Sequence, residues 1–159
     1  MSVRFVFDAD SAIYPSGSFA RLRQFTAGSM VRRVLGFSDT NVERVFFQTT
    51  APSGWSGSMS ASVVSFFTSA TSGSAVWELS VDFRASGCTM NASTFATTAS
   101  AIADANAASN LRVTALNPDD DGAVAGGHLT FLLRRVTTHG SDTAASDCNF
   151  LNLIIADGR

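Results

Sequence analysis

The sequence predicts an all-β protein: a two-sheet sandwich or a barrel of about eight strands, preceded by an extended N-terminal arm. All eleven basic residues are Arg, and only two of the thirteen acidic residues are Glu, so the residues that favour helix surfaces are nearly absent. Serine and threonine fill 37 of the 159 positions and Phe fills thirteen, a composition typical of polar strand faces around an aromatic core. Apolar runs recur roughly every ten to twenty residues between polar turns, as in sandwiches and barrels.

The first thirty residues are expected to form the arm, and residues 31–159 the sandwich. Residues 3–7 are a short strand candidate, and a turn at 14–18 interrupts the irregular stretch that follows. This segment alternates too little to hold itself in place. We therefore expect it to lie along the domain or along a neighbouring subunit.

The next strands are expected at 31–37 and 42–49, joined by the polar segment 38–41. A loop around Trp55 then precedes a run at 59–67, in which the two-residue period slips by one residue. A slip of this kind is typical of a β-bulge.

The clearest alternation in the chain predicts a core strand around Trp77, after a turn at 71–74. Its apolar face is unbroken and the opposite face is largely hydrophilic. A second apolar face is expected on a strand at 128–136, with Arg135 on the same side. The predicted core consists of Trp77, Leu79, Val81, Phe83, Leu129, Phe131 and Leu133.

The least regular part of the chain precedes Val113. Residues 99–108 fit a helical turn or two, and a small strand near 94–98 is an equally good interpretation. A strand is expected around Val113, then a strong turn at 117–122. The last strand is expected at 150–155, with apolar residues on both faces.

No motif in the sequence carries recognisable catalytic chemistry. The segment 117–122 opens like a calcium loop, but the twelfth position of that loop is His128 instead of Glu and no helix pattern flanks it. His128 and His139 lack zinc-ligand spacing, and there is no Gly-x-Ser-x-Gly elbow. We therefore expect a non-enzymatic protein with no catalytic residues, no metal and no cofactor.

Composition also bounds the partners and the compartment. A net charge of −2 argues against nucleic acid, and no apolar run approaches the ~18 residues needed to cross a bilayer. Acidic residues at positions 8 and 10 come too early for a signal peptide, which predicts synthesis in the cytoplasm of the producing cell. Cys88 and Cys148 are expected to be buried free thiols, and a disulfide between them remains an alternative.

Two arginine pairs, Arg32-Arg33 and Arg134-Arg135, are expected within strands. Neighbouring strand residues point to opposite faces, so one guanidinium of each pair should point outward and one inward. We expect ion pairs with carboxylates here, and not a nucleic-acid patch. The candidate carboxylates are Asp82, Asp142 and Asp147.

Several stretches resemble small β-sandwich structural proteins of tailed phages. They are the segment 34–47 followed by 75–79, a glycine turn leading into a strand that ends in Arg at 125–135, and an Asp-Thr loop before the last strand at 141–151. The resemblance covers residues 34–159. It implies a jelly-roll-like domain that assembles as a homotrimer on a virion, where it contacts the major capsid protein. The implied role is a capsid cement or decoration protein, and a tail fibre, collar or baseplate component is the alternative.

Thirteen Phe are more than one small core needs, so part of them should lie at subunit contacts. The expected assembly contacts are Phe5, Phe7, Phe19, Phe25, Arg32 and Arg33. A second alternative function is a carbohydrate-binding module, because Tyr14 and Trp55 on the surface of a sandwich would stack on sugar rings.

Overall fold

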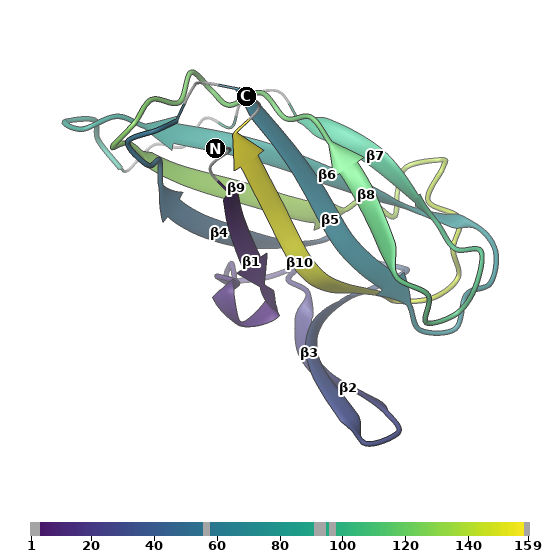
Figure 1. The fold of residues 1–159 in the computed structure, drawn as a ribbon. Coiled ribbons are helices and arrows are strands. Elements are labelled where there is room, and N and C mark those ends of the chain that lie inside the picture. The colour runs from purple at the N-terminus through teal and green to yellow at the C-terminus, as the bar shows by residue number, and fades with distance from the viewer. Residues whose placement is uncertain (1–3, 56–57, 91–94, 96–97, 158–159) are drawn as a thin grey trace.

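The computed structural model describes residues 4–55, 58–90, 95 and 98–157, and the chain forms two antiparallel sheets packed as a sandwich (Figure 1). The all-β prediction is confirmed. In the described residues the strands are β1 (Arg4–Asp8), β2 (Arg21–Ala27), β3 (Met30–Phe37), β4 (Glu43–Thr50), β5 (Met59–Phe67), β6 (Ser74–Arg84), β7 (Ala99–Asp104), β8 (Arg112–Leu116), β9 (His128–Arg135) and β10 (Cys148–Asp157), with a 3-10 turn η1 (Ala9–Ser11).

The order of the strands is that of a jelly roll with additions at its N-terminus. The first sheet, sheet A, runs β2-β3-β10-β5-β8, and β1 also pairs with β10; the second, sheet B, runs β4-β9-β6-β7. Strands β3 to β10 form two four-stranded arrays, β3-β10-β5-β8 and β4-β9-β6-β7, which is the strand order of an eight-stranded jelly roll. Strands β1 and β2 precede it in the chain.

The core lies between the sheets, where the sequence predicted it. All of the predicted core side chains are fully buried except Phe83, which is partly buried against the core. Trp77 on β6 packs edge-to-face on Phe37 of β3, with ring centroids 4.8 Å apart. This contact joins the two sheets through the largest buried side chain.

The predicted bulge lies on a different strand from the one expected. Between β10 and β5, Phe150 pairs with Ser65 and Asn152 with Val64, so the extra residue is Leu151 of β10. The apparent slip in β5 arises because both faces of its second half are buried. Its outward residues there, Val64 and Phe66, are covered instead of being exposed to solvent.

The irregular region before β8 contains a strand where helical turns were one alternative. Residues 99–104 form β7, which pairs with β6, so the helical interpretation is wrong. The alternative strand at 94–98 lies mostly outside the described residues. In β8, Thr114 and Leu116 face inward, whereas Val113 faces solvent.

The N-terminal segment lies along the domain, which was one of the two expected alternatives. Strand β1 adds to sheet A beside β10. Residues 9–20 then cross to the edge of sheet B, where single bridges join Ile13 to Phe46 and Phe19 to Arg44. Strand β2 was not predicted.

The two cysteines are free, and they differ in exposure. Cys148 is fully buried, and this burial raises the pKa of its thiol to about 12. Cys88 is exposed, so the prediction that both thiols are buried is wrong. It follows β6 in a connection that leaves the sandwich, where no sheet covers it.

Candidate functional site

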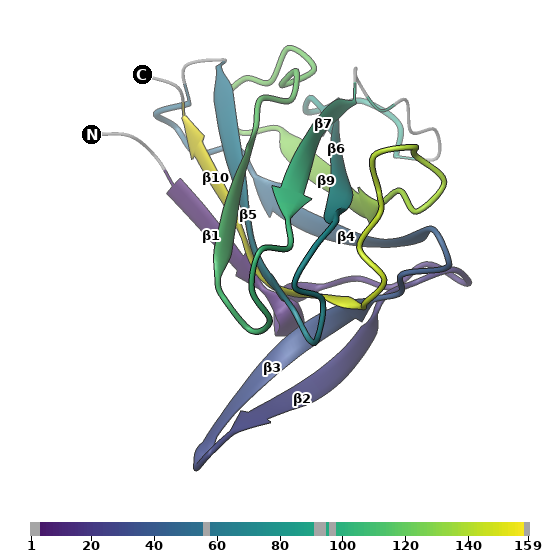
Figure 2. The same cartoon turned by 90° about the vertical axis from the view of Figure 1, so that its right-hand side faces the viewer.

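The β2–β3 hairpin projects from one end of the sandwich (Figures 1 and 2). Its strands pair with each other over seven residue pairs, but only residues 35–37 of β3 also pair with β10. The two residues Gly28-Ser29 join the strands, and Gly28 has the positive φ of 60° that tight hairpin turns favour. Most of the hairpin therefore lies outside the two sheets that bury the core.

Ion pairs at its base set the direction in which the hairpin projects. Arg23 Nη1 lies 2.5 Å from Asp147 Oδ2, just before β10. The same guanidinium covers Gly36, where an added Cβ would come within 2.7 Å of it. Arg33 Nε lies 2.9 Å from Asp10 Oδ1 in the turn after β1. The hairpin is thus tied to the turn after β1 and to the residue before β10, which lie at the same end of the antiparallel β1–β10 pair.

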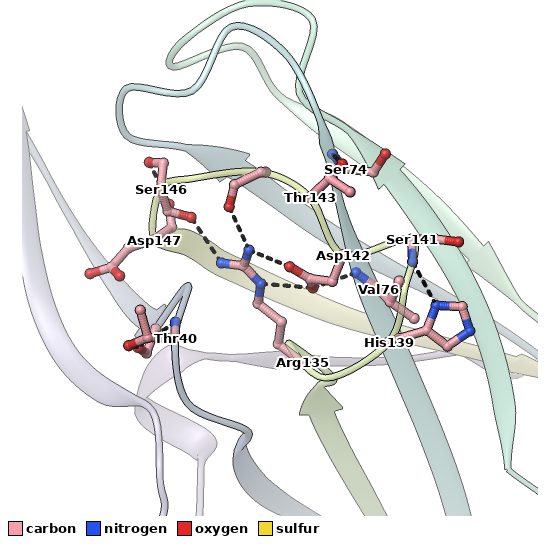
Figure 3. Close-up of polar contacts among 12 residues, drawn as sticks. Thr40, Ser74, Val76, Arg135, His139, Ser141, Asp142, Thr143, Ser146 and Asp147 are labelled. Atoms are coloured by element: carbon pink, nitrogen blue, oxygen red, sulfur yellow. Dashed lines mark hydrogen bonds and ion pairs between the residues drawn. The ribbon is translucent and has the colours of Figure 1, made fainter.

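A buried ion pair holds the segment that carries the base of the hairpin (Figure 3). Arg135 is fully buried, and its Nε and Nη2 donate to the two carboxylate oxygens of Asp142 at 3.0 and 2.7 Å. Its guanidinium also donates to the carbonyl oxygens of Ser146, at 2.8 Å, and Ala144, at 3.0 Å. Asp142 in turn accepts the backbone N–H of Val76 at 2.8 Å, which fixes the β9–β10 connection onto β6.

The arginine pairs behave as predicted in β9 and differently in β3. Arg135 points inward, whereas Arg134 points outward and pairs with Glu78, so the expected division is confirmed there. Arg32 and Arg33 are both exposed, because this part of β3 belongs to the projecting hairpin and has solvent on both faces. The other two candidate carboxylates pair with Arg84, in the case of Asp82, and with Arg23, in the case of Asp147.

The hairpin is cationic and partly apolar. Residues 21–33 contain four arginines and no acid, a charge of +4, while the rest of the chain contains seven arginines and thirteen acids, a charge of −6. At the tip, Met30 and Val31 are 54% and 56% exposed. Arginine and exposed apolar side chains are the residues that protein interfaces favour.

Between the hairpin and the outer face of sheet A lies an open hollow of about 380 Å³. Phe25 of β2 forms one wall and packs edge-to-face on Phe66 of β5, with centroids 4.6 Å apart. Leu111, 56% exposed, lines the opposite side, and Arg32 stands at the hairpin wall. Val113 faces outward from β8 beside this lining and is 65% exposed. Ser109 and Asn152 complete the lining, so the hollow combines apolar walls with two uncharged polar residues and one cation.

The expected assembly residues occupy three different environments. Phe7 is buried in the core against Phe47 and Phe131, because β1 pairs inside sheet A. Phe5 is partly buried next to it. Phe19 is exposed at the edge of sheet B. Of the six residues, Phe5 and Phe7 stack on each other with ring centroids 6.2 Å apart, and Phe25, Arg32 and Arg33 all lie on the hairpin.

A second hollow, of about 370 Å³, lies over the outer face of sheet B. Tyr14, Phe46 and Phe95 line it, and the last two rings stack with centroids 6.2 Å apart. Tyr14 is 40% exposed, and partial desolvation together with the nearby Asp10 carboxylate raises the pKa of its hydroxyl. Trp55 is far less accessible than expected: it is buried in the core beside Phe5.

No group of three or more His, Cys, Asp or Glu suited to a metal ion occurs in the described residues. In the acidic turn, Asp119 and Asp120 accept backbone N–H groups of the turn itself, and Asp121 accepts the N–H of Phe83 at 3.0 Å. His139 Nδ1 accepts the backbone N–H of Ser141 at 3.1 Å. Likewise, no helix of the described chain is long and apolar enough to span a bilayer.

Sequence reasoning missed β2, and with it the hairpin as a unit. The available signal was the pair Gly28-Ser29 between two runs of alternating character, which is a hairpin turn sequence. Four arginines within the two runs obscured the alternation, since they occupy positions that a sandwich strand would fill with apolar residues.

No protein-family model and no curated protein sequence matches the chain. Among solved structures it is similar to the carbohydrate-binding module TmCBM61 in complex with β-1,4-galactotriose, at 7% identity and a TM-score of 0.42, over 96% of this chain and 86% of that one.

A chain from the structure of infectious bursal disease virus strain Gx is similar at 10% identity and a TM-score of 0.44, over 98% of this chain. A β-sandwich carbohydrate-binding module of promiscuous specificity is similar at 7% identity and a TM-score of 0.42, also over 98% of this chain. The present chain spans 32% and 54% of the length of these two.

Proposed function

We propose that this chain is a structural protein of a virion, a capsid cement or decoration protein that stabilises the head by bridging major capsid subunits. The observation that carries the proposal is the cationic hairpin, which projects from a compact sandwich with its apolar tip in solvent. Folding of the chain itself leaves Met30 and Val31 at the tip largely in solvent, so they are suited to binding another protein.

Two further points support this role. The sequence of residues 34–159 resembles tailed-phage structural proteins. The jelly-roll strand order also occurs in viral capsid domains, although lectin domains share it and fold alone does not define function.

The proposed mechanism is mechanical and not catalytic. The hairpin tip binds the major capsid protein, and the sandwich contacts further copies of the same chain in a homotrimer. Linked contacts raise the effective concentration of each hairpin at its site, so that weak individual contacts hold the lattice together.

The test uses particles purified without this protein, to which the full chain is added back. We expect wild-type chain to occupy regular positions on the head in electron micrographs. The variant M30E/V31E is changed only at exposed tip positions. It should bind at least about tenfold more weakly, because it places charged groups where binding would bury apolar ones. The control I102E, at an equally exposed position on β7, should bind like wild type. Equal binding by the wild type, M30E/V31E and I102E would refute the role of the hairpin.

The same images test the alternative that the chain is a tail fibre, collar or baseplate component. Density on the tail fibre, the collar or the baseplate, with none on the head, would assign the chain to the tail.

A carbohydrate-binding module is the second candidate, and the aromatic hollow on sheet B favours it. Tyr14, Phe46 and Phe95 offer ring faces and edges of the kind that pack on sugars, with Gln48 and Thr130 as polar neighbours. Glycan-array binding by the wild-type chain that is lost in Y14A, without any particle binding, would place this function first.

A further inference from the structure

The hollow between the hairpin and sheet A combines apolar walls, two uncharged polar residues (Ser109 and Asn152) and an unmatched charge. Phe25, Phe66 and Leu111 supply apolar surface, and no acidic side chain lines the hollow. Across residues 4–55, 58–90, 95 and 98–157, no carboxylate lies within ion-pair distance of Arg32, although Arg23 and Arg33 both have partners. A segment that fits this hollow needs an apolar side chain next to negative charge.

The loop between β8 and β9 has this combination. Asp119, Asp120 and Asp121 lie within it, and none of the three forms an ion pair in the described part of the chain. Val124, three residues after Asp121, is 57% exposed. The carboxylate oxygens accept N–H groups at 2.9 to 3.0 Å from the turn and from β6, so the shape of the loop is set before any contact forms.

The hairpin and this loop lie at opposite ends of the sandwich (Figures 1 and 2). They cannot meet within one chain, so a contact between them joins two copies head to tail. A twofold contact between two hairpins is disfavoured, because it would bring four arginines from each copy together. In a head-to-tail contact, each copy uses its hollow for one neighbour and keeps its acidic loop for another. Such contacts close into a ring when the rotation between neighbouring copies permits.

We propose that the hollow beside the hairpin receives the acidic loop 117–126 of a second copy of this chain. Arg32 then faces the carboxylates of Asp119 to Asp121, and Val124 lies on the apolar lining. This inference rests on the proposed function as an assembling subunit and names the surfaces through which copies associate. In the expected homotrimer the contact repeats three times around the ring and leaves the hairpin tips available for the capsid.

The test is sedimentation equilibrium of the full-length chain over a range of concentrations, with a melting curve for each variant. Wild type should self-associate, and R32E should weaken the association constant by about tenfold or more, because it places like charges together. The control R44E reverses the charge of an exposed arginine on β4, outside the hollow. It should change the association constant less than about twofold. The double variant R32E/D119R should restore much of the association.

Asp119 also accepts a hydrogen bond in its turn, so a variant that leaves the turn unchanged is needed as well. V124S replaces an exposed apolar side chain with a smaller polar one, and it should weaken association about fivefold. The inference is overturned if R32E and V124S associate like wild type, or if R44E weakens association as much as R32E.

The two proposals fail in different ways. A wild type that stays monomeric at all concentrations and still binds particles overturns this inference and leaves the cement role intact. A wild type that associates through Arg32 and Val124 but never binds a particle supports the inference and overturns the cement role.

Discussion

Replacement of Arg135 by Met would break the buried ion pair that fixes the β9–β10 connection. The substitution keeps an apolar stem, which ends two atoms short of the guanidinium nitrogens Nη1 and Nη2, and it removes four hydrogen bonds. Asp142 would remain 2% exposed with no cation beside it, and the carbonyls of Ala144 and Ser146 would lose their donor. Removing one partner of a buried ion pair costs about 3–5 kcal/mol, so we expect a loss of that size.

The measurement is urea denaturation, with the free energy of unfolding extrapolated to water. For a chain of this size the expected loss corresponds to a decrease of roughly 6–20 °C in the melting temperature. The double variant R135M/D142N removes the stranded charge, so it should be more stable than R135M alone. The matched control R134M breaks the more exposed pair with Glu78 and should cost about 1 kcal/mol or less.

A loss below about 1 kcal/mol for R135M would refute the reasoning. It would mean that the connection rearranges to hydrate Asp142 at little cost, and that the segment at the base of the hairpin is not fixed by this pair. Equal losses in R135M and R134M would contradict it as well, since the argument depends on the difference in burial.

Four further outcomes are expected. Trp77→Ala should cost about 3–5 kcal/mol in urea denaturation, and an unchanged melting temperature would remove Trp77 from the core. In the native chain one thiol, that of Cys88, should react with iodoacetamide at neutral pH, whereas Cys148 should react only after unfolding, because burial raises its pKa to about 12. Burial also raises the pKa of Glu43 above 4.5, so its protonated form favours the fold; stability should fall as pH rises from 4.5 through the raised pKa, and E43Q should lack this decrease in pH-dependent melting. Addition of EDTA should leave the melting curve and the sedimentation profile unchanged, whereas a drop reversed by calcium would assign a cation to the acidic turn at 119–121.

Local sequence patterns determined the interior of this protein well. The alternation around Trp77 and the apolar face that ends in Arg135 predicted which side chains meet between the sheets, because a strand exposes alternate residues to opposite faces. The inward position of Arg135 followed from the same rule, and the need of a buried charge for a partner left Asp82, Asp142 and Asp147 as candidates. The structure selects Asp142.

Tertiary structure alone decided which outward-facing residues remain in solvent. Phe66 is buried where Phe25 of the hairpin packs on it, whereas Val113 on the same outer face is 65% exposed, although both are apolar in the sequence. Trp55 was expected at the surface and lies in the core beside β1, a contact between segments fifty residues apart.

The hairpin is the clearest case of this division. Its alternation is weak because neither face is buried for most of its length, so the hydrophobic signal that identifies other strands is absent. Its strands pair with each other, while ion pairs to Asp10 and Asp147 set its direction. Periodicity reports burial within a layer; the position of a segment outside the layers depends on long-range contacts, which a local pattern does not contain.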